Sequence, residues 1–283
     1  MSIVLNSEKE KELNRLGYTI LGNLDSEVFS EFKKVSLDFI EKTKKKYPKG
    51  ELFNLINSDL EIKLVSNAIV AKYLNPFVET KLNTEAVDIY PVSHLVKPFG
   101  LNSDIWHQDS AVVDERKDFS LNVWVPFVDV NRLNGCLWIL PGSHISINFA
   151  RQFGYNPIEG EALRTFKKHM ISIKVKAGEV LIFYRNLIHG SSRNWLPVSR
   201  IAAESVVVSK NAQFYNFHRE DSIAKNKVLG YQVQMEHFLK ENPKEDFYTG
   251  KYPYIEFDDE GFENIQNYLV KSIPAFLNHS RGN

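Results

Sequence analysis

Short β-rich runs separated by turns fill residues 85–208, and they constrain the fold more than any other feature of the chain. Asn134-Gly135 predicts a hairpin because both residues tolerate a positive φ, and Pro141-Gly142 predicts a further turn. Many short strands at this spacing predict a jelly roll or a sandwich of two sheets. The expected strands are 86–92, 120–128, 136–140, 171–175, 180–184 and 201–208.

The residues before this β region show helical patterns instead. Asn6 and Ser7 are suited to cap a helix that Gly17 ends, and a long amphipathic pattern starts at Ser26. We expect this helical part, about residues 1–84, to pack against the outside of a β core at about 85–209. The expected elements are helices at 7–16, 26–40 and 60–74 and a first strand at 18–21.

Two further segments do not fit the strand rhythm. Residues 146–170 are rich in arginine, lysine and aromatic residues, and helical patterns return near 222–240 and 261–277. Inserts of this kind on a β scaffold often form lids over a site. Because β chains of this size are often single domains, we expect one domain, 1–283, with a helical, lid-like C-terminal part at about 210–283.

Composition narrows the class of partner. Lysine plus arginine and aspartate plus glutamate both number 35, so there is no net charge to attract nucleic acid. The one cysteine, Cys136, cannot form an internal disulfide. The sequence lacks a signal-peptide pattern and an apolar run of bilayer length. We expect a cytoplasmic protein with a small-molecule substrate and no nucleic-acid or membrane partner, while the oligomeric state stays open.

A His-x-Asp pair lies in the segment Trp106-His107-Gln108-Asp109. Residues two apart in an extended segment project to the same face, so His107 and Asp109 point the same way. His189 follows another expected strand, and a jelly roll can bring its loop against them. Two imidazoles and one carboxylate suit Fe(II) and leave coordination positions open for a co-substrate and oxygen.

Arg200 strengthens this interpretation. It lies eleven residues after His189 and opens the apolar run 201–208, so its side chain can reach the interior. A buried guanidinium needs an anionic partner, and a dicarboxylate bound to the metal would supply one. His-x-Asp alone is a weak motif, but its conjunction with a distal histidine and this arginine indicates an oxygen-using enzyme.

At these residues the chain resembles the phytanoyl-CoA dioxygenase family of Fe(II)/2-oxoglutarate oxygenases. The resemblance runs from about Val96 to Val206. The residues that carry it are Lys97-Pro98, Gly100, Trp106-His107-Gln108-Asp109, Asn134-Gly135-Cys136-Leu137, Leu140-Pro141-Gly142-Ser143-His144, His189-Gly190-Ser191, Asn194 and Arg200.

The resemblance implies a mainly β fold with flanking helices around a double-stranded β-helix, a cupin-like jelly roll. Fe(II) would be bound by His107, Asp109 and His189. Arg200 would hold the far carboxylate of 2-oxoglutarate as a bidentate pair, and Ser191 would add a hydrogen bond to that carboxylate.

The resemblance also implies a reaction. Trp124 matches a position that packs against the co-substrate, and Asn122 points to the same face. The reaction would use O2 and convert 2-oxoglutarate to succinate and CO2, coupled to hydroxylation of an unactivated C–H bond. Halogenating relatives carry glycine or alanine where this chain has Asp109, so hydroxylation is favoured. Desaturation, ring formation and epimerisation use the same ligands and stay open.

Four residues are candidates for contact with the substrate. Trp138 lies in an expected central strand, and His94 lies on the strand that enters the site. Arg116 follows the metal segment in a loop, and Tyr155 lies in the 146–170 insert. The simpler interpretation is core packing for Trp138 and solvated surface for Arg116.

We therefore expect a hydroxylase of a small molecule, either an amino acid or an intermediate of specialised metabolism. Three alternatives stay open. The same chemistry could act on an acyl-CoA or carrier-tethered substrate. A cupin-like isomerase or binding protein would use the metal without 2-oxoglutarate. A catalytically silent member would serve as an interaction scaffold.

Overall fold

The computed structural model describes residues 2–43, 59–101, 103–146, 149–156, 158–219, 226–240 and 252–258, together with Leu269, Lys271, Ala275, Asn278 and Ser280. Its helices are α1 Ser7–Leu16, α2 Ser26–Thr43, α3 Leu60–Tyr73, α4 Asn75–Glu79, α5 Ser143–Ser146, α6 Gly160–Lys167 and α7 Met235–Lys240. Its strands are β1 Tyr18–Asn23, β2 Val87–Lys97, β3 Ser103–His107, β4 Ser120–Pro126, β5 Leu137–Ile139, β6 Ile171–Ser172, β7 Glu179–Tyr184, β8 His189–Ser191, β9 Arg200–Ser209, β10 Phe214–His218, β11 Lys227–Val233 and β12 Tyr254–Asp258.

The N-terminal elements follow their sequence signals. The Asn6 side chain accepts hydrogen bonds from the backbone N–H groups of Glu8 and Lys9, at 3.1 and 3.0 Å, which satisfies two donors at the start of α1. Gly17 ends this helix at φ +87°, and its N–H donates to Leu13. The predicted capped helix and the strand after it are confirmed.

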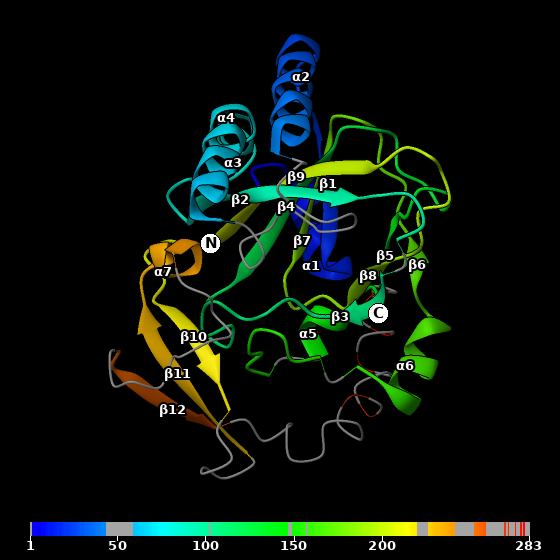
Figure 1. Ribbon diagram of the computed structural model, residues 1–283. Helices are drawn as coiled ribbons and strands as arrows, with labels where there is room; N and C mark the ends of the chain where they lie inside the picture. The colour runs from blue at the N-terminus through cyan, green and yellow to red at the C-terminus, as the bar shows by residue number, and fades with distance from the viewer. Residues whose placement is uncertain are drawn as a thin grey trace.

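Two antiparallel sheets form the β core. One has the strand order β1-β7-β4-β9-β2 and the other the order β3-β8-β5-β6. Helices α2, α3 and α4 lie over the larger sheet, and the smaller sheet lies on its other side (Figure 1). This architecture confirms the predicted mainly β, jelly-roll fold with flanking helices.

Strand β4 separates two different environments, because its side chains alternate between the faces of the larger sheet. Leu121, Val123 and Val125 enter the hydrophobic cluster under α2 and α3. Trp124 enters the cluster between the two sheets. Asn122, two residues before Trp124, points to this same interior. The strand therefore builds the helix-covered core with one face and the interior of the jelly roll with the other.

Strand β2 is longer than the predicted run 86–92 because it continues to Lys97. Pro91 lies next to a register shift between residues 91 and 93 in the pairing with β9. Proline cannot donate to a ladder and is tolerated on edge strands, and β2 is the edge of its sheet. Pro91 therefore interrupts the sequence pattern without ending the strand.

The C-terminal part differs from the expectation of helices. Residues 227–233 form β11, which pairs with β10 on one side and β12 on the other. The predicted helix at 222–240 is therefore wrong over this range, and among the described residues of 222–240 only Met235–Lys240 is helical. Val228, Leu229 and Tyr231 are buried, so pairing on both sides overrides the weak helical pattern. The helix expected at 261–277 lies almost wholly outside the described residues.

None of the helices in the described ranges combines the length and apolar character needed to cross a bilayer.

His94 lies on the helix-covered face of the larger sheet. Its ring nitrogens Nδ1 and Nε2 are hydrogen-bonded to Ser66 Oγ at 2.7 Å and Ser36 Oγ at 2.9 Å. The side chain is completely buried, and burial lowers its pKa to about 3. Contrary to the sequence expectation, His94 contacts α2 and α3 and points away from the interior of the jelly roll.

The contact between α2 and the larger sheet depends on Phe32. Its ring stacks on Tyr73 at 5.2 Å and meets Phe127 edge-on at 4.9 Å, and the side chain has no exposed surface. We expect Phe32→Ala to lower the free energy of unfolding by about 3–5 kcal/mol. The matched control, Phe99→Ala, removes a ring that is 61% exposed and should change it by less than about 1 kcal/mol. Urea denaturation measures both, and equal effects would contradict this packing.

The buried His94 makes stability depend on pH. Between pH 6.5 and about 3 the unfolded chain binds a proton at this imidazole and the folded chain does not. Stability is therefore full above pH 6.5 and falls on acidification by up to about 1.4 kcal/mol per pH unit. His94→Gln removes this dependence. The difference in unfolding free energy between wild type and variant should shrink as the pH falls from 6.5 to 5, and a constant difference would refute the assignment.

Candidate metal centre

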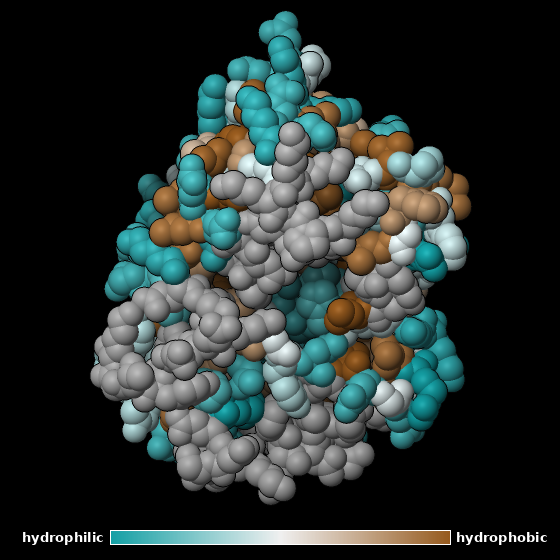
Figure 2. Space-filling model, viewed as in Figure 1, coloured by the Kyte–Doolittle hydropathy of each residue, from teal (hydrophilic) through white to brown (hydrophobic). Residues whose placement is uncertain are grey.

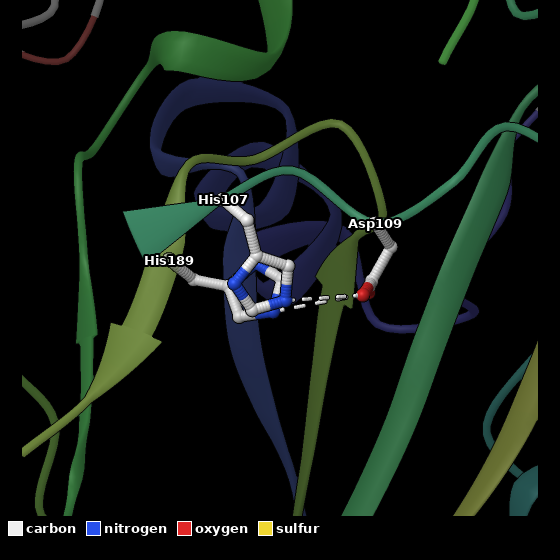
Figure 3. Close-up of side chains that lie close together, drawn as sticks. All are labelled: His107, Asp109 and His189. Atoms are coloured by element: carbon white, nitrogen blue, oxygen red, sulfur yellow. Dashed lines mark ion pairs between the residues drawn. The ribbon is translucent and has the colours of Figure 1, made fainter. Parts of the chain in front are cut away.

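Pairing between β3 and β8 brings the two histidines together. His107 and His189 are directly opposite each other in the antiparallel register, so their side chains share a face. Their ring centroids are 4.5 Å apart. Asp109 follows His107 by two residues, and its backbone N–H donates to Arg185 at 2.9 Å. Figure 3 shows the three side chains converging on one point between these segments.

The donor atoms are spaced for a single ion. His107 Nε2 lies 3.5 Å from Asp109 Oδ1, and His189 Nε2 lies 3.8 Å from Asp109 Oδ2. Two donor atoms bound at about 2.1 Å to one ion lie at most about 4.2 Å apart, so both distances fit. Within the part of the chain that the structure describes, this is the one group of three or more such side chains suited to hold a metal.

Backbone carbonyls fix the orientation of both imidazoles. His107 Nδ1 is 3.1 Å from the carbonyl oxygen of Ile105, and His189 Nδ1 is 2.9 Å from that of Leu187. A carbonyl only accepts, so each Nδ1 carries the proton and donates it. Each Nε2 lone pair is therefore left facing Asp109, which is the arrangement that outer hydrogen bonds give to metal-binding histidines.

A polar relay holds the carboxylate of Asp109. Asn122 Nδ2 donates to Asp109 Oδ2, and Asn122 Oδ1 accepts from Arg185 Nη1 at 2.6 Å. Arg185 Nη2 also donates to the carbonyl of Ser110. The sequence suggested Asn122 as a co-substrate residue, whereas the structure shows its amide on the aspartate.

The electrostatics of the cluster favour an ionised aspartate and a neutral imidazole at His189. Burial opposes the charge of Asp109, but Arg185 and the two histidines hold its pKa well below the usual range. Burial, together with His107 and Arg185, lowers the pKa of His189 to about 4. Burial alone would lower the pKa of His107, but the hydrogen bond and the charge of Asp109 outweigh burial, so the pKa is raised. The anionic carboxylate suits a cation bound between the three residues.

A second part of the interior is cationic. Arg200 is 5% exposed, Nη1 donates to the carbonyl of Gly135 at 2.8 Å, and the guanidinium lies 5.4 Å from the Trp124 ring centroid. Its buried Nε has no hydrogen-bond partner, and Arg200 makes no ion pair within 4.0 Å, among the described residues. A buried charge in this state needs an anionic ligand, as 2-oxoglutarate would provide.

Lys97 was missed as a site residue in the sequence. It pairs with Arg200 across β2 and β9, is 1% exposed, and its Nζ donates to Ser191 Oγ at 2.7 Å. The structure therefore groups Lys97, Arg200, Ser191 and Trp124. The sequence would have indicated Lys97 if β2 had been extended past Pro91 as far as Lys97, but the proline suggested that the strand ended earlier.

The remaining substrate candidates do not form one group. Trp138 in β5 packs edge-on against Trp106, with ring centroids 6.3 Å apart. Arg116 is engaged elsewhere: its Nε donates to Asp114 at 2.7 Å and its Nη1 to the carbonyl of Asp258. Tyr155 is half-buried in the insert, close to the charges of Arg219 and Glu159.

Comparison with known proteins agrees with this geometry. The protein-family model described as phytanoyl-CoA dioxygenase matches residues 33–202. A curated relative, "Phytanoyl-CoA dioxygenase" from Arabidopsis thaliana, is 31% identical over 127 residues, which cover 42% of this chain and 43% of the relative. The chain spans less than half of the length of the curated relatives it matches.

Two solved structures share the fold. The non-heme alpha ketoglutarate dependent carbocyclase SnoK from nogalamycin biosynthesis is 18% identical with a TM-score of 0.53, covering 74% of this chain and 86% of SnoK. HygX from Streptomyces hygroscopicus, with nickel and 2-oxoglutarate bound, is 13% identical with a TM-score of 0.51, covering 73% of this chain and 88% of HygX.

The matched region of the family model includes every member of the three-residue cluster and Arg200. Together with the cluster, it supports Fe(II) as the metal and 2-oxoglutarate as the co-substrate. Because the model covers more than half of the sequence, the chain belongs to the phytanoyl-CoA dioxygenase family of Fe(II)/2-oxoglutarate oxygenases.

Proposed function

We propose that this protein is an Fe(II)/2-oxoglutarate-dependent hydroxylase that acts on a small molecule, an amino acid or an intermediate of specialised metabolism. One observation carries the proposal: the metal cluster and a buried arginine without a counter-ion face the same interior. Trp124 contacts Arg200, and Asn122 contacts Asp109. The side chains of Trp124 and Asn122 project from the same face of β4, because they are two residues apart.

His107, Asp109 and His189 would hold the iron. The bound Fe(II), with 2-oxoglutarate and O2, would supply the oxidation of an unactivated C–H bond, yielding succinate and CO2 as co-products. The protein's contribution is to fix the donor atoms. Ile105 and Leu187 orient the imidazoles, and Arg185 acts through Asn122 to orient the carboxylate.

Arg200 would bind the distal carboxylate of 2-oxoglutarate, because a guanidinium matches the geometry of a carboxylate with two parallel hydrogen bonds. Its unpartnered Nε supports this role. Lys97 and Ser191 would contribute charge and a hydroxyl to the same carboxylate, and Trp124 would cover the carbon chain. Asp109 fills the position that is open in halogenating relatives, which favours hydroxylation.

The experiment that tests the function is anaerobic addition of Fe(II) and then 2-oxoglutarate to the purified protein. A weak visible charge-transfer band should appear, because a 2-oxo acid chelated to ferrous iron absorbs there. Exposure to O2 should then yield succinate. Absence of the band from protein with iron demonstrably bound would contradict the proposal and favour a metal protein that does not use 2-oxoglutarate. Mass changes in candidate substrates separate hydroxylation from desaturation or ring formation.

Removal of one donor should weaken metal binding strongly. We expect His107→Ala and His189→Ala to weaken Fe(II) binding by at least about 100-fold, because only two donors would remain and outer-shell changes alone cost 10–100-fold. His169→Ala is the matched control, since His169 lies outside the cluster. Anaerobic equilibrium dialysis with metal analysis gives the affinities. Retention of one tightly bound iron by either cluster variant would show that another site holds the metal.

Arg200→Ala should separate co-substrate binding from metal binding. We expect 2-oxoglutarate to bind about 30-fold or more weakly, the effect of removing one partner of a buried charge pair, while Fe(II) binding stays unchanged. Titration of the charge-transfer band measures this. The control is Arg193→Ala, because Arg193 is exposed and lies over Trp195. Normal 2-oxoglutarate affinity in Arg200→Ala would refute the assignment.

A further inference from the structure

Glu204 is an acidic side chain in the interior wall that the proposed chemistry does not use. It lies on β9, four residues after Arg200 and directly opposite Trp124 on β4. Paired residues in an antiparallel sheet share a face, with Cβ atoms about 5 Å apart. Glu204 therefore points to the same interior as Trp124 and Asn122. It lies on the β9 side of β4, opposite to the side on which β7 lies.

The carboxylate of Glu204 is not committed to the protein. Among the described residues it accepts no hydrogen bond and forms no ion pair within 4.0 Å. The nearby cations Arg185 and Arg200 form no ion pair with it within 4.0 Å; Arg185 instead donates to Asn122 and Ser110. Glu204 is also outside the metal-ligand group, so its carboxylate lies too far from the cluster to complete it.

Glu204 nevertheless keeps part of its surface exposed. The residue is only half-buried, although it projects from a central strand into the interior. Figure 2 shows a hollow in the middle of the displayed face with hydrophilic atoms at its floor, in the region of the view where β7 and β8 lie in Figure 1. Burial, followed by the charge of Asp109, raises the pKa of Glu204 to about 8, although Arg185, His107 and Arg200 act in the opposite direction. The surroundings therefore disfavour a carboxylate that has no cationic partner.

The charge of a ligand that would bind beside Glu204 follows from these neighbours. A second anion at this position would be repelled by both Glu204 and Asp109. A neutral apolar group would leave the carboxyl desolvated and unpaired, which costs free energy. A cation with N–H donors would offset the desolvation and relieve the repulsion between the two acids.

We propose that Glu204 determines substrate specificity, and that the substrate carries a protonated amine or a guanidinium bound against its carboxylate. The inference rests on the proposed function for the identity of the site, and it deepens that function by naming the substrate class. Among the open alternatives, it favours an amine-bearing small molecule over an acyl-CoA thioester, because a thioester offers no cation to Glu204.

The test uses ligand pairs that differ in one group. The probes are n-butylamine and n-hexylamine against butan-1-ol and hexan-1-ol, and L-lysine against 6-hydroxynorleucine. Ligand-observed saturation-transfer NMR measures their binding to the full chain loaded with Zn(II) and 2-oxoglutarate, in which no turnover occurs. We expect at least one amine to bind tenfold or more tightly than its alcohol.

Variants assign this discrimination to Glu204. Glu204→Gln keeps the shape and removes the charge, so the amine-to-alcohol ratio should fall below threefold while the affinity for 2-oxoglutarate stays unchanged. Glu204→Asp keeps the charge and should retain part of the ratio. Glu161→Gln, a change at an exposed acid on α6, is the matched control. The unchanged 2-oxoglutarate affinity shows that each variant is folded.

Three outcomes would overturn the proposal: no amine exceeds its alcohol in the wild-type protein, the ratio survives in Glu204→Gln, or Glu161→Gln lowers it equally. The ferrous charge-transfer band is recorded on the same preparations. If the wild-type protein shows a normal band but no preference for amines, the role of Glu204 is refuted and the proposed use of 2-oxoglutarate is not. Amine discrimination without a band refutes the use of 2-oxoglutarate and leaves Glu204 as a cation site.

Discussion

Alternation of side chains along β4 is the constraint on which the site depends. This strand lies in the middle of the larger sheet, and every residue in it is buried. The odd-numbered positions from Leu121 to Val125 pack under the helices, and the even-numbered ones supply Asn122 and Trp124 to the interior. A slip of one residue would exchange the two sets and remove the supports of both Asp109 and Arg200 at once. The helix-covered core thus fixes the register that the chemistry needs.

Local signals made much of this fold predictable. The cap at Asn6, the glycine at position 17 and the branched runs of the central strands each determine structure within a few residues, and the structure agrees with them. The convergence of His107, Asp109 and His189 was also expected, because two strand ends were sufficient to place them together. The role of these residues as ligands stays a prediction.

What could not be predicted depends on partners distant in sequence. Residues 227–233 are strand because two neighbouring strands accept their hydrogen bonds. Asn122 was assigned to the co-substrate pocket because alternation gives the face of a side chain but not its nearest partner on that face. His94 was misplaced because the sequence did not reveal the register shift before it in the pairing of β2 with β9. Lys97 was overlooked because its strand was expected to end at residue 92.

The proline in β2 has a consequence for the behaviour of the whole molecule. An edge strand presents a row of donors and acceptors to which a strand of another molecule can add. At Pro91 that row lacks one N–H, and the adjacent register shift bends the strand away from a regular ladder. The β2 edge of the larger sheet is therefore a poor template for continued pairing, so this edge resists the addition of another strand even though the sheet is rich in valine and isoleucine.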